Sequence, residues 1–584
     1  MKRSEKAQKV VDGFQESVKL RQMLLSLAGC AHCGLCNDSC HYYLATGDPE
    51  MTPAAKSDKI RRLYKYHNDR LGRIFPWWVG GETLKTDEDL EELKDIVYGS
   101  CTMCRRCTFN CPFGIDTALL MRTARGLITA QGVAPEGILS VMKDQWEIGN
   151  QMGVTPKDYI ETLEWLEEEV QDELPDFKVP IDKEGADIVY VINPREVKYA
   201  PQSLMAAFKI FHLAGENWTM PSQGWDNTNF GLFSGDNKLG AHMGNLAFNQ
   251  AKKLGVKKMV ISECGHGFRS TKWESPNWAK ANPLPFEIES ILETMVRYVN
   301  QGRIVLDRTR NKEPVTYHDP CNLSRSAGIT EEPRFLLKRS CMDFREMYPN
   351  RQDSFCCTGG GGAMSMSEYA SKRIEVGRIK ADQIRATGAK HVATACHNCE
   401  DGLSDLVKHY KLGVTVKNVC EFVADACALP EEKRKLVSMP IADIAKGKKI
   451  LVIDDQPDVV QYLEAFLKDQ GFSVVIAMNG AQGLAKAKQE RPDLITLDIT
   501  MPGKSGIEVF TALRKDPDTK DIPVFIITGV MNFRQLMYYR EVMPPDAYME
   551  KPIDTEALLL NLRRLLDERK HGSKPADTAN MTAV

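Results

Sequence analysis

Five cysteines between Cys321 and Cys399 constrain this chain more than any other feature. Cys321 closes the stretch VTYHDPC, Cys396 closes HVATAC, and the pair Cys356-Cys357 precedes a run of glycines. VTYH and HVAT are rich in β-branched residues, and each predicts a short strand that ends just before its cysteine. Because the carboxyl ends of parallel strands meet at one edge of a sheet, we expect these thiols to converge. Thiolates in this number indicate a soft metal, above all an iron–sulfur cluster.

Two further cysteine runs share one spacing, C-x2-C-x2-C-x3-C, in the N-terminal part of the chain. They are Cys30, Cys33, Cys36 and Cys40, and Cys101, Cys104, Cys107 and Cys111. This is the spacing of a bacterial two-cluster ferredoxin, in which the fourth cysteine of each run usually binds the other cluster. Zinc is the alternative, but a zinc site needs only four ligands, commonly as two CxxC pairs. We therefore expect two [4Fe-4S] cubanes in a helical, ferredoxin-like domain.

An amphipathic helix is expected over about residues 1–28, before the first run. The long insertion between the two runs carries basic residues and the pair Trp77-Trp78. Its basic residues are interpreted either as a docking site for an electron-donor partner or as a solvated helix face.

Composition places the chain among soluble, redox-active proteins. Seventeen cysteines without an export signal indicate metal or redox chemistry rather than disulfides. The net charge of -3 gives no global signal for nucleic acid or for an anionic membrane. No apolar run approaches the ~18 residues that a membrane span needs. We predict a cytoplasmic protein whose link to a membrane comes from a partner.

An α/β domain with an internal repeat is expected over residues 185–427. Its predicted strands are DIVYVINP, KKMVISEC, VTYHDPC and HVATAC, with helical stretches between them, which favours a parallel sheet. AFNQAKKLGVKKMVISECGHG resembles IKADQIRATGAKHVATACHNC, and VYVINPR resembles TYHDPC. This pairing places Arg195 against Cys321, Cys264 against Cys396, and Gly267 against Cys399. The first half has therefore lost four of five ligands, and we expect one cluster in this domain.

Polar residues also end the strands predicted in the C-terminal part. They are Asp454, Asp455, Asp498, Thr528 and Lys551. Three carboxylates gathered at strand ends form an oxygen site for Mg²⁺. A hydroxyl and an ammonium group would complete a pocket for a phosphoryl group.

The pattern C, then CC with glycines, then CxxC resembles the cysteine-rich domain of heterodisulfide reductase catalytic subunits. The resemblance implies a noncubane [4Fe-4S] cluster that cleaves a disulfide, held by Cys321, Cys356, Cys357, Cys396 and Cys399. The sequence departs from the family at Thr358, where a glycine is usual, and this puts the local loop geometry in question.

A narrower resemblance joins the two cysteine-rich parts. The ferredoxin-like module and the stretch ENWTMPSQGWDNTNFGLFSGD are similar to the cytoplasmic iron–sulfur subunit of membrane complexes linked to dissimilatory sulfite reduction. That branch implies electrons from quinol through a haem-b-bearing membrane subunit, together with other subunits. It also implies a small sulfur-carrier protein, bearing a disulfide or trisulfide, as the substrate.

The C-terminal part resembles the response-regulator receiver domain. The resemblance implies that Asp498 accepts a phosphoryl group, that Asp454 and Asp455 bind Mg²⁺ with it, and that Thr528 and Lys551 couple to switching. A histidine kinase is the implied partner. The alternative is a docking module that is never phosphorylated.

Taken together, the sequence predicts a multidomain α/β protein. The expected parts are a two-cluster ferredoxin-like domain (1–178), a cysteine-rich α/β domain with an internal repeat (185–427), a linker (428–447), a doubly wound (βα)5 receiver domain (448–570) and a disordered tail (571–584).

Two roles for single residues stay open, as does the function itself. Cys264 either acts on the substrate or is a buried thiol. His318 and Asp319 either donate hydrogen bonds or protons, or only orient Cys321. The leading hypothesis is a quinone-linked thiol/disulfide oxidoreductase subunit. The alternatives are a redox sensor that reports to a phosphorelay, and a related subunit that acts on another disulfide.

Overall fold

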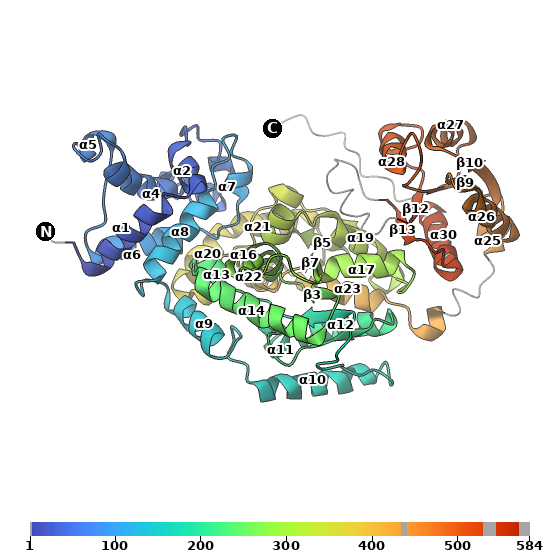
Figure 1. Ribbon diagram of the computed structural model, residues 1–584, viewed down its shortest axis with the longest axis horizontal. Coiled ribbons are helices and arrows are strands. Elements are labelled where there is room, and N and C mark those ends of the chain that lie inside the picture. Colours follow the sequence, from blue (N-terminus) through green and yellow to red (C-terminus); the bar gives the residue numbers. More distant parts are fainter. Residues whose placement is uncertain (1–2, 434–440, 530–544, 571–584) are drawn as a thin grey trace. The chain divides into compact units, whose positions relative to one another are not determined.

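The computed structural model describes residues 3–433, 441–529 and 545–570 (Figure 1). The chain divides into two compact units: residues 1–295 with 307–426, and residues 296–306 with 427–584. The predicted tail, 571–584, and part of the predicted linker, 434–440, lie outside the described residues. Near its end the linker forms a short helix, α25 (Ala442–Ala445).

The N-terminal part of the first unit is helical. Its helices are α1 (Glu5–Ser17), α2 (Arg21–Ala28), α3 (His41–Thr46), α4 (Pro53–Asn68), α5 (Pro76–Val79), α6 (Asp87–Val97), α7 (Arg106–Phe109), α8 (Thr117–Thr129), α9 (Glu136–Glu147) and α10 (Pro156–Gln171). The single helix expected over about residues 1–28 is wrong, because α1 and α2 are separate. Buried side chains follow helical spacing from Ala7 to Val18, but the next one is Met23, so the apolar stripe loses its phase there.

A single hydrophobic core joins these helices to the α/β part that follows. It contains Phe14 of α1, Leu120 and Met121 of α8, and also Phe233 and Met366 from the cysteine-rich region. The helical and α/β parts therefore pack as one body, which fixes the first two cysteine runs relative to the five-cysteine segment.

Two four-stranded parallel sheets form the α/β part. The sequence predicted a parallel sheet but did not indicate that the strands divide between two sheets. The first contains β1 (Ile188–Val191), β2 (Trp218–Thr219), β3 (Lys258–Ile261) and β4 (Glu287–Ser290) in the order β2-β1-β3-β4. The second contains β5 (Val315–His318), β6 (Phe344–Arg345), β7 (His391–Thr394) and β8 (Thr415–Asn418) in the order β6-β5-β7-β8. The order is the same in both sheets, as the internal repeat predicts.

Helices connect the strands of both sheets. In the first half they are α11 (Pro194–Lys198), α12 (Pro201–Leu213), α13 (Gly231–Ser234), α14 (Asn237–Leu254), α15 (Gly265–Arg269), α16 (Ser275–Trp278) and α17 (Ile291–Asn300). In the second half they are α18 (Cys321–Ala327), α19 (Glu331–Ser340), α20 (Ala370–Val376), α21 (Arg378–Thr387), α22 (His397–His409) and α23 (Val419–Ala426). The short helices α15 and α18, one from each half, pack against each other.

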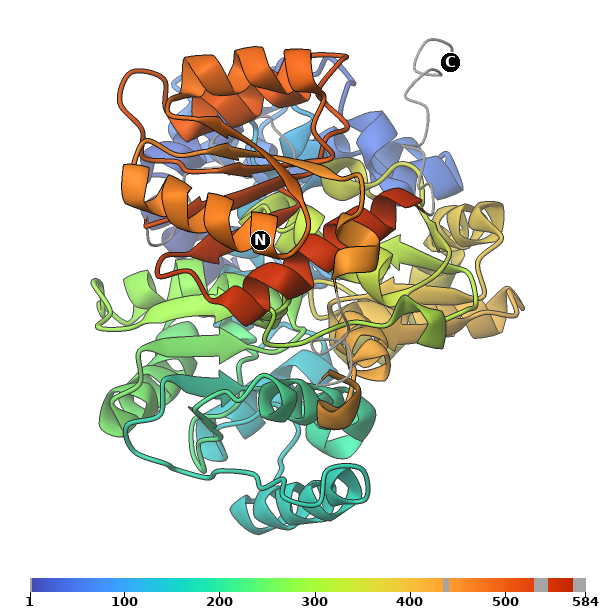
Figure 2. The same ribbon diagram turned by 90° about the vertical axis from the view of Figure 1, so that its right-hand side faces the viewer.

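The second unit contains a five-stranded parallel sheet in the order β10-β9-β11-β12-β13. Its elements are β9 (Lys449–Ile453), α26 (Pro457–Asp469), β10 (Ser473–Ala477), α27 (Gly480–Glu490), β11 (Leu494–Leu497), α28 (Gly506–Lys515), β12 (Val524–Thr528), β13 (Ala547–Glu550) and α30 (Thr555–Lys570). Helices α26 and α30 share one core with the sheet, and α27 and α28 share the other (Figure 2). This is the doubly wound arrangement that the sequence predicts.

Candidate functional site

The second sheet brings the sulfurs of the five-cysteine segment together. Cys321 opens α18 just beyond β5, and Cys396 precedes α22 just beyond β7. Cys399 lies in the first turn of α22, with its sulfur 3.1 Å from that of Cys357. Cys321 is half-buried and the other four are buried. The hydrogen bond from Cys399 lowers the pKa of the Cys396 thiol to about 6, which favours the thiolate that a metal requires.

The glycine run lets two loops approach each other. Gly361 has φ +67°, and a Cβ there would lie 2.6 Å from the carbonyl oxygen of Thr102 in the second cysteine run. Thr358 also adopts a left-handed conformation, with φ +67°. This explains why a glycine is usual at that position in the family, since a β-branched residue is strained in this region. The Thr358 amide donates to Cys356 Sγ at 3.3 Å, so the departure keeps the loop closed around the sulfurs.

Three nitrogen-bearing side chains lie near sulfurs of the five-cysteine segment. The ring of His318 lies within 4.8 Å of the Cys357 and Cys399 sulfurs, and neither ring nitrogen has a hydrogen-bond partner among the described residues. Arg325 Nη2 is likewise buried without a partner among them. Lys380 Nζ, also buried, donates to Met347 Sδ at 3.4 Å, and burial lowers the pKa of this lysine to about 8. Unpaired donors in a buried site indicate an absent acceptor, and an anionic iron–sulfur cluster fits that need.

His318 and Asp319, which the sequence paired in one role, separate in the structure. Asp319 forms a two-point ion pair with Arg334, with both oxygens 2.8 Å from the guanidinium nitrogens, and also accepts from the Arg351 amide. It is therefore a structural anchor behind Cys321, whereas His318 faces the sulfurs.

Cys264 is fully buried at the end of β3, in the first half of the repeat. Asn193 Nδ2 and His266 Nδ1 each lie 3.4 Å from its sulfur. Burial raises the pKa of this thiol well above its usual value. A buried thiol of raised pKa is a poor nucleophile, which favours the structural interpretation of Cys264.

A buried ion-pair network connects the two halves behind the CxxC loop. His397, between Cys396 and Cys399, lies 3.1 Å from Glu196 of the first half and 3.1 Å from Glu400. Burial alone would lower the pKa of His397, but the two carboxylates raise it well above its usual value. The imidazolium thus ties the first half to the loop that carries two of the five sulfurs.

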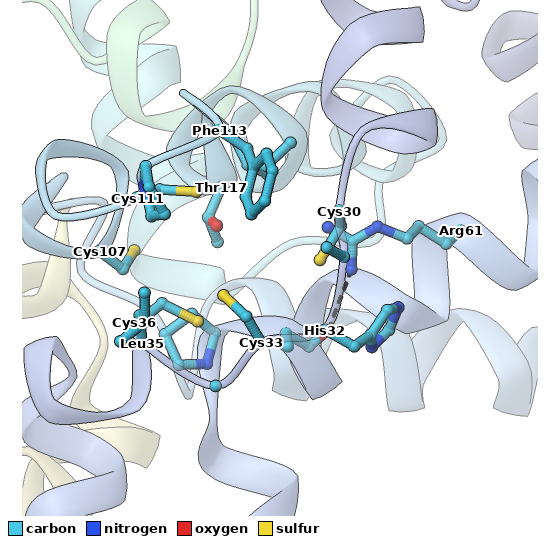
Figure 3. Close-up of a pocket in the computed structure, with 16 residues that line it drawn as sticks. Cys30, His32, Cys33, Leu35, Cys36, Arg61, Cys107, Cys111, Phe113 and Thr117 are labelled. Atoms are coloured by element: carbon cyan, nitrogen blue, oxygen red, sulfur yellow. Dashed lines mark hydrogen bonds between the residues drawn. The ribbon is translucent and has the colours of Figure 1, made fainter.

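The two N-terminal cysteine runs fold into matching loops. His32 and Gly34 in the first run have positive φ, as do Met103 and Arg105 at the same positions of the second. Alternating right- and left-handed residues turn backbone N–H groups toward one centre, which suits an anionic cluster. Figure 3 shows the first centre, a cavity lined by Cys30, Cys33 and Cys36 of the first run and by Cys107 and Cys111 of the second.

The second run surrounds the other centre and adjoins the five-cysteine site. Burial and the neighbouring sulfurs of Cys104, Cys40 and Cys101 raise the pKa of Cys107 well above its usual value. The fourth cysteine of each run, Cys111 or Cys40, therefore lies near sulfurs of the other run.

Contacts across the interface then join this centre to the five-cysteine site. Thr102 Oγ1 lies 3.3 Å from Cys356 Sγ, and Arg325 Nε donates to the Cys104 carbonyl at 2.8 Å. Arg125, fully buried, donates to the carbonyls of Cys101 and Gly361 at 2.6 and 2.7 Å. The three sulfur-lined centres form a series: first centre, second centre, five-cysteine site.

A different site lies at the strand ends of the second unit. Carboxylate oxygens of Asp454, Asp455 and Asp498 lie within 4.8 Å of one another, and Asp455 Oδ1 has no hydrogen-bond partner among the described residues. Lys551 Nζ donates to Asp454 and Asp498 at 2.9 and 3.0 Å. Thr528, fully buried, ends β12 on the same edge. Three oxygens with spare acceptor capacity fit a divalent cation such as Mg²⁺.

Comparisons with known proteins agree with this division. Residues 26–115 match the 4Fe-4S dicluster domain family, residues 315–404 the cysteine-rich domain family, and residues 450–563 the response regulator receiver domain family. The chain is 28% identical over 455 residues to the Hdr-like menaquinol oxidoreductase iron-sulfur subunit 2 of Archaeoglobus fulgidus, covering 70% of this chain and 81% of the relative. It is 29% identical to a subunit of the dihydromethanophenazine:CoB–CoM heterodisulfide reductase of Methanosarcina mazei, covering 70% of this chain and 95% of that subunit.

The receiver part has its own relative. Over 118 residues the chain is 37% identical to protein PilH of Pseudomonas aeruginosa, covering 97% of that protein. Residues 450–563 belong to the response regulator receiver family. The whole chain is a heterodisulfide-reductase-like iron–sulfur oxidoreductase subunit fused to a receiver domain.

Several residues of this iron–sulfur subunit escaped the sequence interpretation. Lys380, Arg325 and Arg125 looked like ordinary helix residues, because a charged residue in an amphipathic helix normally faces solvent. Only their burial marks them. Lys380 lies on α21 among Ala381 and Ile384, which are also buried, so it occupies the apolar face of its helix. A charge on the apolar stripe was the available signal.

Proposed function

We propose that this chain is the catalytic iron–sulfur subunit of a membrane-associated electron-transfer complex. It passes electrons between a quinol-linked, haem-b-bearing membrane partner and a thiol/disulfide or trisulfide substrate. The substrate is a small sulfur-carrier protein of dissimilatory sulfur metabolism, and the receiver domain regulates the transfer. The names of the relatives support the quinol and disulfide ends of this proposal, since one is a menaquinol oxidoreductase subunit and another a heterodisulfide reductase subunit.

The observation that carries the proposal is the contact between the second cysteine run and the five-cysteine site. Thr102 Oγ1 and Cys356 Sγ lie 3.3 Å apart although 254 residues separate them in the chain. Buried arginines bind backbone carbonyls of both loops and so hold the two loops in direct contact. A sensor would not require a relay of three centres that ends in a buried sulfur site.

The sulfurs that lie close together support one assignment of cluster ligands. Cys30, Cys33, Cys36 and Cys111 would hold one cubane, and Cys101, Cys104, Cys107 and Cys40 the other. Cys321, Cys356, Cys357, Cys396 and Cys399 would hold the noncubane cluster. When bound, these clusters supply one-electron transfer and thiophilic iron.

The protein's own part in the reaction is to supply protons and hydrogen bonds to sulfur. Reduction of a disulfide to two thiols takes up two electrons and two protons. Lys380 Nζ and the His318 ring are buried beside Cys357. Neither donates a hydrogen bond to an oxygen atom of the described residues. We assign them hydrogen-bond donation to sulfur at this site. Asp319 and Arg334 hold the strand end behind them.

For the receiver domain we propose phosphorylation of Asp498 by a histidine kinase, with Mg²⁺ held by Asp454, Asp455 and Asp498. Thr528 and Lys551 would couple the phosphoryl group to switching. The test is to treat the full-length protein with a small phosphodonor and Mg²⁺ and to measure acid-labile phosphate. Label in the wild type and none in Asp498→Ala supports the site, whereas equal label in both contradicts it.

The experiment that tests the main proposal is iron analysis with EPR on anaerobically purified, full-length protein. Three four-iron clusters predict about 12 Fe per chain. An oxidised thiol substrate should produce a signal that is absent from Cys356→Ala. About 8 Fe and no such signal would leave only the ferredoxin-like clusters. That outcome would favour a redox sensor that reports through the receiver domain.

A further inference from the structure

The insertion between the two cysteine runs ends in an exposed apolar loop, residues 69–81, which we call the aromatic hook. It follows α4 and contains the one-turn helix α5, labelled in Figure 1. Five large apolar side chains are exposed here: Leu71 (50%), Ile74 (64%), Phe75 (41%), Trp77 (75%) and Trp78 (73%). Soluble proteins rarely expose apolar residues at this density unless the patch binds something.

The aromatic rings of the hook pack on one another rather than on the core. The ring centres of Phe75 and Trp77 are 5.5 Å apart, and those of Phe75 and Trp78 are 6.5 Å apart. Neither indole N–H donates to another residue in the part of the chain that the structure describes. Each tryptophan therefore presents an apolar ring and a free donor together.

Hydrogen bonds fix the hook in this shape. The Asp69 side chain accepts from the amides of Leu71 and Gly72 at 2.8 and 3.0 Å. Arg73 Nε donates to the His67 carbonyl at 2.8 Å, and the Gly81 amide donates to the Pro76 carbonyl at 2.7 Å. The apolar side chains are thus held outward by the backbone of the hook itself, so little ordering entropy remains to oppose binding.

The exposed charges of the hook are positive. Beyond Asp69, whose carboxylate accepts from the hook's own amides, the charged residues as far as position 81 are Arg70 and Arg73, and both are exposed. On the adjoining end of α4, Lys65 is exposed too, whereas the exposed Arg62 is paired with Glu82 at 3.4 Å. A cationic rim around exposed tryptophans is complementary to an anionic lipid surface, where indole rings lie among headgroups and guanidinium groups bind phosphates.

We propose that the aromatic hook inserts into the surface of an anionic lipid bilayer and anchors this chain there directly. The mode is insertion into the interface, since no described helix is long and apolar enough to cross a membrane. This goes beyond the proposed function, in which only a partner subunit provides the membrane link. The lipid anchor and the proposed function can also fail independently, because lipid binding requires no electron transfer and disulfide chemistry requires no lipid.

The test uses the full-length holoprotein and protein-free vesicles of phosphatidylcholine, with or without phosphatidylglycerol. Wild type should sediment with the anionic vesicles, and brominated acyl chains should quench its tryptophan fluorescence. Trp77→Ser/Trp78→Ser should weaken binding by about tenfold or more and lose most of the quenching. Arg70→Gln and Arg73→Gln should each weaken binding by about fivefold. Added salt should weaken vesicle binding by these variants less than it weakens binding by the wild type.

Trp165→Ser is the matched control, because Trp165 is 47% exposed but lies on α10. It should bind as wild type does, and all variants should retain their iron. The proposal is overturned if wild type does not bind the vesicles or if Trp77→Ser/Trp78→Ser binds equally well. It is also overturned if the hook variant fails only on native membranes whose proteins are intact, because the hook would then dock on a protein. Loss of concentration-dependent self-association in that variant, with no vesicle binding by wild type, would assign the hook to a second copy of the chain.

Discussion

The two halves of the cysteine-rich domain have one fold and two chemistries. Both sheets have the same strand order. The two central strands are β1 and β3 in the first sheet and β5 and β7 in the second, and the loops that follow them carry the residues that differ between the halves. The second half gathers five sulfurs at those ends, and the first half retains only Cys264. The comparison teaches that strand pairing and apolar packing maintain the fold, while a handful of residues beyond the strand ends decides what it binds.

The lost ligand positions of the first half have been filled by other contacts. Gly267, opposite Cys399 in the repeat, has no room for a side chain, since a Cβ would lie 2.5 Å from Asn227 Oδ1. Arg195, opposite Cys321, forms an ion pair with Asp401 of the second half. Glu196 pairs with His397. The first half thus supports the CxxC loop of the second, and the first two comparisons below test that division of labour.

The largest contrast is expected between Cys399→Ala and Cys264→Ala. Cys399→Ala removes one of the five sulfurs, so about four iron atoms per chain and all disulfide activity should be lost. Cys264→Ala should retain the full iron content and lower the free energy of unfolding by about 1 kcal/mol, because it removes only a buried sulfur. Iron analysis and chemical denaturation measure both. If Cys264→Ala also lost iron, the first half would be a ligand donor and the contrast between the halves would disappear.

Glu196→Gln should show how far the ligand half depends on its support. The substitution leaves the buried His397 imidazolium without one of two carboxylates, which should lower the free energy of unfolding by about 3 kcal/mol. Asp401→Asn, at the less buried ion pair with Arg195, is the matched control and should lower the free energy of unfolding by less. Denaturant titration measures the free energy of unfolding of both variants. Equal losses would mean that the Glu196–His397 pair supports the second half no more than the Arg195–Asp401 pair does.

Lys380→Met should change the electronic properties of the site rather than its assembly. Removing a buried positive charge disfavours the more negative, reduced state, so the midpoint potential of the five-cysteine site should fall by about 100 mV. Iron content should be unchanged. Lys408→Met, at an exposed position of α22, is the control. Redox titration followed by EPR gives the potentials, and an unshifted potential in Lys380→Met would exclude its hydrogen-bond role.

The smallest effect is expected at Thr358. Thr358→Gly relieves the left-handed strain and should raise the free energy of unfolding by about 1 kcal/mol at most. Thr358→Ala keeps the strain and should give no such gain. Thermal denaturation of the two variants compares them directly. A gain in Thr358→Ala instead would locate the cost in the buried hydroxyl.

Much of this arrangement could be predicted because it depends on short stretches of the sequence. The spacing within Cys30–Cys40 and Cys101–Cys111 depends on a loop of eleven residues, and the strand before Cys321 or Asp498 depends on four. The internal repeat was visible because both halves retain the same strand, turn and helix pattern. The sequence alone thus determined the fold class, the three cysteine groups and the receiver domain.

Tertiary structure alone decided how the centres are connected and which charges are buried. Nothing near Arg125 or Lys380 in the sequence indicates that one would bridge two loops and the other face the sulfurs, because each contact joins segments far apart in the chain. The outward orientation of the aromatic hook and the Glu196–His397 pair could not be predicted for the same reason. Short-range preferences are set by neighbouring residues, whereas burial, and with it the energy of a charge or an exposed ring, is set by what the rest of the chain packs around it.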